Sequence, residues 1–243
     1  MATEEQATVS SGIEFYGGYQ VYSETGVDLT LLRANLKRTI DERLEKNSRG
    51  IRLVAELAAA GRPSKALDMA LKRPRPDLEV EKIVHQLADH QVQFVLIGGL
   101  AMRVRGSAHI TEDFDFCYAR TTENIAALAA ALAPLHPYLR GAPPGLPFKL
   151  NPPTIQAGLN FTLESDCGDI DLLGEVKGIG TFEQVLAQSD VRVVYGVPIH
   201  VLTLNGLIIS KKAAARYKDH GHIVELEELK KMEDAEQGGT DHA

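Results

Sequence analysis

Two aspartates separated by a single phenylalanine, Asp113 and Asp115, restrict the fold of this chain more than any other feature. The stretch from Asp113 to Tyr118 is otherwise mostly apolar and predicts a strand. Side chains alternate between the two faces of a strand, so both carboxylates point to the same side. A second acidic segment, Asp169 to Asp171, has the same alternation. The pattern predicts neighbouring strands that gather carboxylates on one face of a sheet.

Paired carboxylates of this kind suit a hard divalent cation. Mg²⁺ prefers oxygen ligands, and one or two protein carboxylates often hold it together with water and substrate phosphates. A third carboxylate from a neighbouring strand would complete the site, and spacing leaves open whether Asp169 or Asp171 supplies it. Asp171 lies between apolar neighbours, where an unpaired carboxylate is costly to bury, and we favour it for that reason.

Two glycines precede the acidic strand. Gly98 and Gly99 follow an apolar run, Val92 to Ile97, that predicts a buried strand, and a short helix from Leu100 to Arg105 comes next. Glycines let backbone amides approach a phosphate closely, and a helix N-terminus favours negative charge. The glycine pair and the Asp-x-Asp motif are each common when they occur alone, and exposed acids on a strand edge are the ordinary alternative. The two motifs, together with the hydroxyl of Thr111, predict a phosphate-transfer site.

Basic residues gather near the end of a helix predicted from Leu204 to Tyr217. They are Lys211, Lys212, Arg216 and Lys218. Cations are favoured near a helix C-terminus whatever the function. Binding of a triphosphate is the functional alternative, and it would suit a domain that also carries a metal site.

Charge and hydropathy exclude several classes of protein. The net charge is −7, and residues 81 to 243 hold 14 Lys and Arg against 21 Asp and Glu, which argues against a general electrostatic grip on nucleic acid. The longest apolar run, Phe94 to Met102, is too short for a membrane span, and the N-terminus lacks a signal-peptide pattern. We expect a soluble, cytoplasmic protein without a membrane partner. Two cysteines, Cys117 and Cys167, predict no disulfide framework, and Cys167 falls in a turn where it could be exposed.

The fold class predicted is α+β, a mixed β-sheet flanked by helices with an N-terminal helical appendage. Helical periodicity begins at Val27, and polar residues with a glycine at 47–50 predict the turn of a helical hairpin. Pro74 and Pro76 mark the best domain boundary. A Pro- and Gly-rich stretch, Pro134 to Pro153, predicts a long substrate-facing loop. The predicted parts are a loosely ordered leader (1–26), the hairpin (27–76), the main domain (77–232) and a disordered tail (233–243).

Five segments in order resemble the minimal nucleotidyltransferase superfamily, and most closely its bacterial AbiEii-like branch, which is associated with type IV toxin-antitoxin systems. The resemblance covers about residues 80 to 232. The segments are Phe94 to Ala101, Thr111 to Phe116, Asn160 to Leu163, Gly168 to Gly174, and Leu207 to Asp219.

The resemblance implies transfer of a nucleoside monophosphate from a nucleoside triphosphate to a hydroxyl group, with two Mg²⁺ ions. By match to the motifs, Asp113, Asp115 and Asp171 would be the catalytic and metal-binding carboxylates. The nucleotide would be held by Gly98, Gly99, Thr111, Lys211, Arg216 and Lys218. The acceptor stays open between a tRNA end, a protein and a small molecule, and the role would be toxin-like.

The chain departs from the family pattern at two places. His109 stands where Arg is expected, and His222 replaces an expected carboxylate. These departures support an alternative, a catalytically weak nucleotide-binding or antitoxin-type interaction protein. A structural module with solvated acids is a further alternative. The segment from Thr25 to Lys37 and onward resembles, more weakly, short helical proteins encoded upstream of such transferases. Residues 27–76 could therefore be an antitoxin-like or docking element, and they could bind an antitoxin or mediate self-association.

Overall fold

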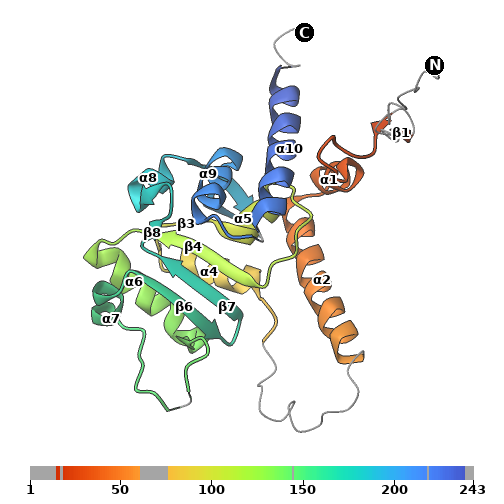
Figure 1. Ribbon diagram of the computed structural model, residues 1–243. Coiled ribbons are helices and arrows are strands. Elements are labelled where there is room, and N and C mark those ends of the chain that lie inside the picture. Colours follow the sequence, from red (N-terminus) through yellow and green to blue (C-terminus); the bar gives the residue numbers. More distant parts are fainter. Residues whose placement is uncertain (1–14, 17–18, 61–75, 144, 218, 239–243) are drawn as a thin grey trace, which may run out of the picture.

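The computed structural model describes residues 15–16, 19–60, 76–143, 145–217 and 219–238 (Figure 1). Its centre is a seven-stranded sheet in the order β10-β11-β3-β4-β7-β6-β5. The pairs β11–β3 and β4–β7 are parallel and the other four are antiparallel, so the predicted mixed sheet flanked by helices is confirmed. The strands of this sheet are β3 (Phe94–Leu96), β4 (Asp113–Tyr118), β5 (Tyr138–Leu139), β6 (Asn160–Ser165), β7 (Gly168–Leu173), β10 (Ser189–Val194) and β11 (Val197–Leu202).

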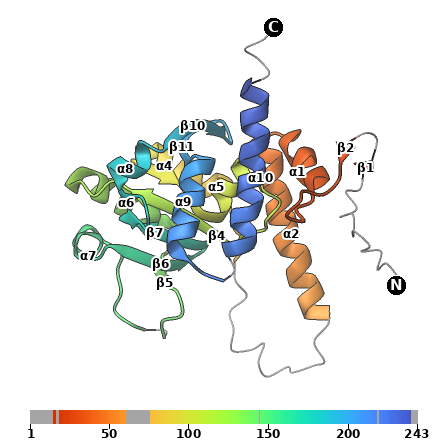
Figure 2. The same ribbon diagram turned by 45° about the horizontal axis from the view of Figure 1, so that its top comes forward.

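Helices cover the sheet and extend beyond it. Helices α4 and α6 pack together, while α5 packs on β4 and also contacts α2 and α9. Figure 2 shows α9, α5, α10 and α2 next to one another across the molecule. The helices are α1 (Leu29–Leu36), α2 (Ile40–Ala60), α4 (Val80–Asp89), α5 (Gly98–Val104), α6 (Thr122–Leu132), α7 (Pro152–Ala157), α8 (Phe182–Leu186), α9 (Leu204–Ala214) and α10 (Asp219–Gly238), with the short 3-10 helix η1 (Ala133–Leu135).

Strand β4 shows the alternation that its sequence predicted. Phe114 and Phe116 are fully buried, whereas Asp113 and Asp115 are only partly buried. Phe116 packs edge to face on Phe94 of β3, with ring centroids 5.5 Å apart. One face of β4 therefore contributes to the core and the other carries the carboxylates.

The N-terminal helices differ from the predicted hairpin. Helix α2 runs without a break from Ile40 to Ala60, so the turn expected at 47–50 is wrong. The residues that suggested it serve tertiary packing: Asn47 is fully buried and hydrogen-bonds to Thr111, and a Cβ on Gly50 would lie 2.7 Å from the side chain of Ile110. The chain turns instead between α1 and α2. Residues 61–75, the rest of the predicted hairpin segment, lie outside the described residues.

Several segment ends also differ from the sequence prediction. Helix α9 ends at Ala214, because Ala215 is left-handed with φ 51°, so Arg216 is not on that helix. Helix α10 continues to Gly238, so the described part of the predicted tail, 233–238, is helical. The predicted loop from Pro134 to Pro153 contains β5, at the edge of the sheet. The described part of the predicted leader includes two short paired strands, β1 (Phe15–Tyr16) and β2 (Tyr19–Gln20).

Further short elements lie between β7 and β10. Strands β8 (Glu175–Val176) and β9 (Gly180–Thr181) pair with each other, and α8 begins at a capping box on Thr181.

Cys117 and Cys167 are both free and fully buried, so the exposure expected for Cys167 is wrong. Burial raises the pKa of the Cys117 thiol to about 12, which leaves it unreactive at neutral pH.

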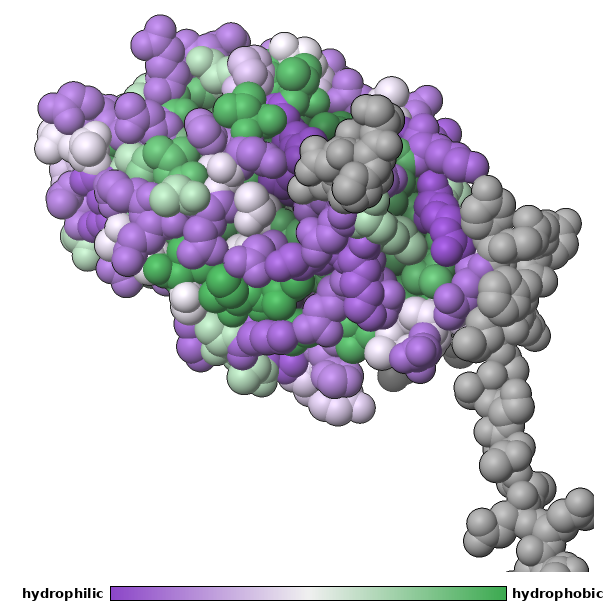
Figure 3. Space-filling view, turned by 90° about the horizontal axis from the view of Figure 1, so that it is seen from above, coloured by the Kyte–Doolittle hydropathy of each residue, from purple (hydrophilic) through white to green (hydrophobic). Residues whose placement is uncertain are grey.

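Seen from above, the described surface has groups of hydrophobic residues that lie between hydrophilic ones (Figure 3). Across the described residues, every helix is too short or too polar to cross a bilayer.

Candidate active site

Four carboxylates share one face of the sheet, and we call them the carboxylate face: Asp113, Asp115, Asp169 and Asp171. The first two lie on β4 and the last two on β7, which pair in parallel. In that register Asp113 lies opposite Asp169, and Asp115 lies opposite Asp171. Two acidic pairs that are far apart in the sequence are therefore neighbours.

The two glycines at the start of α5 lie against this face. Gly98 has φ +62°, a conformation that favours glycine, and a Cβ there would collide with Oδ2 of Asp115. A Cβ on Gly99 would collide with Oγ1 of Thr111. The Gly99 amide donates a long hydrogen bond of 3.4 Å to Oδ2 of Asp115. Both positions thus need glycine, and the structure brings Gly98, Gly99, Thr111 and Asp115 together as predicted site residues.

The charges on this face are not balanced. Burial raises the pKa of Asp115 to about 7, and the nearby negative charges of Asp171 and Asp113 contribute to the rise, against the opposing influence of the Gly99 amide and Lys211. The pKa of Asp171 is also raised, first by burial and then by Asp113 and Asp169, although Arg140 opposes this. A site with these properties favours an added positive charge.

Arg140 is a residue of the site that the sequence analysis missed. It follows β5, and its guanidinium lies 2.8 Å from Asp171, 3.1 Å from Asp169 and 3.6 Å from Asp113. Little in the sequence pointed to it, because Arg140 stands in a Pro- and Gly-rich stretch without periodicity. Only the pairing of β5 with β6 brings it within reach of the carboxylates.

Asp169 is more deeply buried than Asp171, with side-chain exposures of 6% and 24%. The sequence argument that favoured Asp171 as the buried carboxylate is therefore wrong. Asp171 nevertheless lies opposite Asp115 and has the largest electrostatic influence on its pKa. That position is the better reason to prefer Asp171 as the third carboxylate.

The predicted phosphate-binding cations lie in different surroundings. Lys211 is mostly buried, pairs with Asp219 at 3.0 Å and lies 3.2 Å from Nδ1 of His222. It is close enough to the carboxylate face to lower the pKa of Asp115. Arg216 is exposed beyond the end of α9, and Lys218 lies outside the described residues. Of these three cations, the structure places Lys211 near the carboxylates.

The two histidines that depart from the family pattern contact each other. The rings of His109 and His222 have centroids 4.0 Å apart at an interplanar angle of 54°. Burial lowers the pKa of His222, and the positive charge of Lys211 lowers it further, against the opposing charges of Asp219 and Glu225. His222 is therefore expected to be mostly neutral at pH 7. It provides a polar contact for Lys211 without adding a second charge.

The carboxylate oxygens of this face are possible ligands for a metal ion. Among the described residues, no three His, Cys, Asp or Glu side chains are arranged as a ready metal site. Asp113 and Asp115 still fit Mg²⁺, which takes hard oxygen ligands and often needs only one or two protein carboxylates. Burial and the negative charges of Asp171 and Asp113 raise the pKa of Asp115, and a bound cation would favour its charged form. These two residues would hold the ion.

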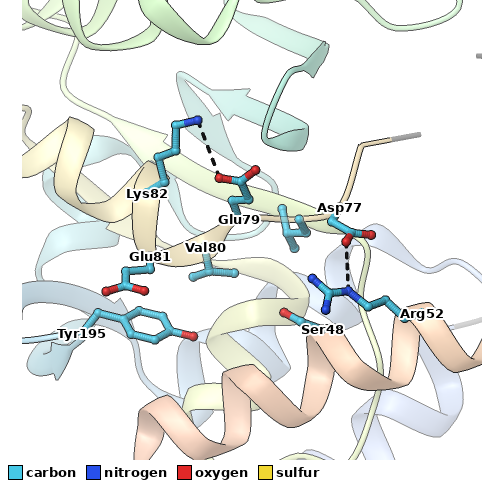
Figure 4. A pocket seen from close by; sticks show the side chains of 9 residues that line it. Ser48, Arg52, Asp77, Glu79, Val80, Glu81, Lys82 and Tyr195 are labelled. Atoms are coloured by element: carbon cyan, nitrogen blue, oxygen red, sulfur yellow. Dashed lines mark hydrogen bonds and ion pairs between the residues drawn. The ribbon is translucent and has the colours of Figure 1, made fainter. Parts of the chain in front are cut away.

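A cavity of about 400 Å³ lies elsewhere, between α2, the start of α4 and the turn at Tyr195 (Figure 4). In its wall Arg52 pairs with Asp77 at 2.9 Å, and Lys82 pairs with Glu79 at 3.6 Å. None of the four carboxylates lines it. It is therefore separate from the candidate active site.

Comparison with known proteins finds only distant similarity to solved structures. The chain matches no protein-family model and no curated protein sequence. Among solved structures, it is similar to the antibiotic-resistance factor ANT(2'')-Ia, with 13% identity and a TM-score of 0.40 over 67% of this chain and 93% of that one. It is also similar to a "putative nucleotidyltransferase" from Thermotoga maritima, with 15% identity and a TM-score of 0.38 over 64% and 91% of the two chains. At these values the similarity assigns neither an activity nor a ligand.

Proposed function

We propose that this chain is a nucleotidyltransferase that moves a nucleoside monophosphate from a nucleoside triphosphate to a hydroxyl group. The observation that carries the proposal is the carboxylate face, where two parallel strands bring Asp115 and Asp171 opposite each other beside Gly98 and Gly99. Such a site combines oxygen ligands for a cation with a backbone that a phosphate can approach.

In the proposed reaction, the acceptor oxygen forms a bond to the α-phosphorus and the bond from that phosphorus to the pyrophosphate oxygen breaks. The proton of the acceptor hydroxyl passes to a carboxylate. Asp171 is our candidate base, since its raised pKa brings it closer to the value that suits proton transfer at neutral pH. Arg140 bonds to Oδ1 of Asp171, which makes Oδ2 the candidate proton acceptor.

The remaining residues would bind and orient the nucleotide. Gly98, Gly99 and Thr111 would line the triphosphate, and Lys211 would neutralise part of its charge. Arg216 and Lys218 are proposed to contribute from the segment after α9. Mg²⁺, held by Asp113 and Asp115, would supply positive charge against the phosphates when bound.

The test is transfer of label from each α-labelled nucleoside triphosphate, with Mg²⁺, to three acceptor classes: total tRNA, the protein itself and small hydroxyl compounds such as aminoglycosides. We expect one nucleotide to label one acceptor class. Asp113→Asn should lower the rate by at least about 100-fold, the scale seen when one preorganised electrostatic group is removed.

Asp166→Asn provides a matched control, because Asp166 is an exposed carboxylate in the turn between β6 and β7 that pairs with His136. It should leave transfer unchanged. Undiminished transfer by a folded Asp113→Asn protein would refute the assignment of the site.

A second candidate is a catalytically weak nucleotide-binding protein. Arg140 favours it, because one guanidinium already neutralises part of the carboxylate face. In this case Mg²⁺ and a nucleotide at a hundredfold its dissociation constant would stabilise the protein by about 2.7 kcal/mol without any transfer. Thermal unfolding beside the labelling assay separates the two candidates.

A toxin-like role is part of the same proposal. It predicts that expression of the wild type slows bacterial growth and that expression of Asp113→Asn does not. Equal growth inhibition by both proteins would contradict the toxin-like role. The antitoxin-type or self-association role of residues 27–76 would be tested by size-exclusion chromatography with light scattering.

A further inference from the structure

Arg140 reaches the carboxylate face from the far edge of the sheet. Its amide donates to the carbonyl of Thr162 at 3.0 Å, which continues the pairing of β5 with β6. Gly141 follows with φ +75°, so the chain turns away immediately after Arg140. The side chain crosses β6 and meets the two aspartates of β7.

The guanidinium is held by several groups at once. Nε and Nη2 donate to the carbonyl of Leu163 at 3.3 and 3.1 Å, Nη2 donates to Asp171, and Nε lies 3.1 Å from Asp169. The side chain is 21% exposed. A planar guanidinium with five donors suits such multiple contacts. Arg140 is thus a fixed positive charge beside Asp169 and Asp171.

A purely structural role explains these contacts less well. Apolar residues often stabilise a fold as well as a buried ion pair does, so the pairing by itself is weak evidence for a structural role. An arginine that only joined strands would need one carboxylate, whereas Arg140 lies within 3.6 Å of three, from both β4 and β7. Its nearest partners are on β7, and Asp113 of β4 is the most distant of the three. The positive charge is therefore concentrated on one side of the carboxylate face.

The family resemblance implies two Mg²⁺ ions. We propose that Arg140 takes the place of one of them, so that the site binds a single ion at Asp113 and Asp115. This inference rests on the proposed function, because it assumes a metal-binding carboxylate face. It makes Arg140 a residue that sets metal stoichiometry. Removing the guanidinium should open a second site at Asp169 and Asp171.

The test counts Mn²⁺ ions bound per chain, by electron paramagnetic resonance of free Mn²⁺ and by titration calorimetry. Mn²⁺ shares the preference of Mg²⁺ for carboxylate ligands. We expect one ion in the wild type, two in Arg140→Ala and in the larger neutral variant Arg140→Gln, and one in Arg140→Lys, which keeps the charge. Adding Asp171→Asn to Arg140→Ala should return the count to one. Circular dichroism of each variant checks that it is folded.

Arg52→Ala is the matched control, because it also removes one arginine and one ion pair, with Asp77, but on the surface. It should bind one ion. Two ions in the wild type, or one in the folded Arg140→Ala and Arg140→Gln proteins, would overturn the role of Arg140 and leave the proposed function standing. No bound ion in any variant would overturn both.

Discussion

Gly98 is required both by its backbone conformation and by the position of the Asp115 side chain. A side chain there would both strain a backbone with φ +62° and collide with Asp115. We predict that Gly98→Ala costs about 1 to 2 kcal/mol of stability from the backbone alone. It should also weaken Mn²⁺ binding, because the added methyl group displaces the Asp115 carboxylate. Denaturant unfolding and Mn²⁺ titration measure the two effects.

Gly196→Ala is a control that separates the effect of backbone strain from that of the collision with Asp115. Gly196 has φ +78°, yet a Cβ added there would meet no atom within 4 Å, so only strain should appear. It should lose similar stability and keep full Mn²⁺ binding. Equal Mn²⁺ affinities for the two variants would show that Gly98 is not required for the position of Asp115.

The carboxylates themselves were predictable because their arrangement depends on local alternation. Asp113 and Asp115 flank a buried phenylalanine, and any strand would place them on one face. Arg140 was not predictable, because its contacts depend on a two-residue strand pairing at the sheet edge. The relative burial of Asp169 and Asp171 was not predictable from their neighbours along the strand, because burial depends on what packs over the face of the sheet.

Among the elements, α2 supports the segment that leads into β4. Asn47 is fully buried, donates to the Thr111 carbonyl at 2.8 Å and accepts from the Thr111 amide at 3.0 Å. Asn47 and its polar neighbours predicted a turn. The two hydrogen bonds to Thr111 explain instead why an asparagine stands within a continuous helix. We predict that Asn47→Ala lowers the free energy of unfolding by about 1 to 3 kcal/mol, because two backbone groups lose their partner.

The neighbouring Ser48→Ala is a suitable control. Its hydroxyl donates only a long bond of 3.4 Å to Leu44 within the helix, so its replacement should change stability by less than about 0.5 kcal/mol. Chemical denaturation of both variants tests the difference. A loss for Asn47→Ala no larger than that of Ser48→Ala would show that α2 does not hold the segment through Asn47.

An ion pair joins the C-terminal end of α5 to β10, and its contribution to stability should depend on pH. Arg105 is nearly buried and binds both oxygens of Asp190. Although burial raises the pKa of Asp190, its bonds with Arg105 and Arg192 outweigh this and hold the pKa below its usual range. A carboxyl with a lowered folded-state pKa stabilises the fold above its unfolded pKa, and that contribution is lost as the pH falls through the folded value.

We therefore predict that Asp190→Asn destabilises the protein by about 1 to 2 kcal/mol near pH 7, a value reduced for the partial exposure of Asp190. Near pH 3, below the usual pKa of an aspartate, the difference from the wild type should shrink. Denaturant unfolding at both pH values measures this. Asp77→Asn, which breaks an exposed pair with Arg52, should have little effect at either pH. A pH-independent loss for Asp190→Asn would contradict the assignment.

In the whole molecule, the N-terminal helices share the core of the sheet domain. Leu32 of α1 and Leu44 of α2 are buried in the same hydrophobic cluster as β3 and β4. Polar contacts reinforce this: Asn35 donates to the carbonyls of Gly106 and Ser107, and Arg103 donates to the carbonyl of Arg43. An exchangeable docking element would be expected to contact the domain mainly through its surface. These helices instead pack as part of the domain.

Deletion of residues 1 to 76 tests this integration. Each buried leucine contributes about 1.5 to 3 kcal/mol, and each buried polar group left without a partner costs about 1 to 3 kcal/mol. Together these losses approach the total stability of a typical domain, about 5 to 15 kcal/mol. We predict that residues 77 to 243 alone lack a cooperative unfolding transition in circular dichroism. A cooperative transition in that fragment, with Mn²⁺ binding retained, would instead identify the helices as a separable appendage that could be released from the site.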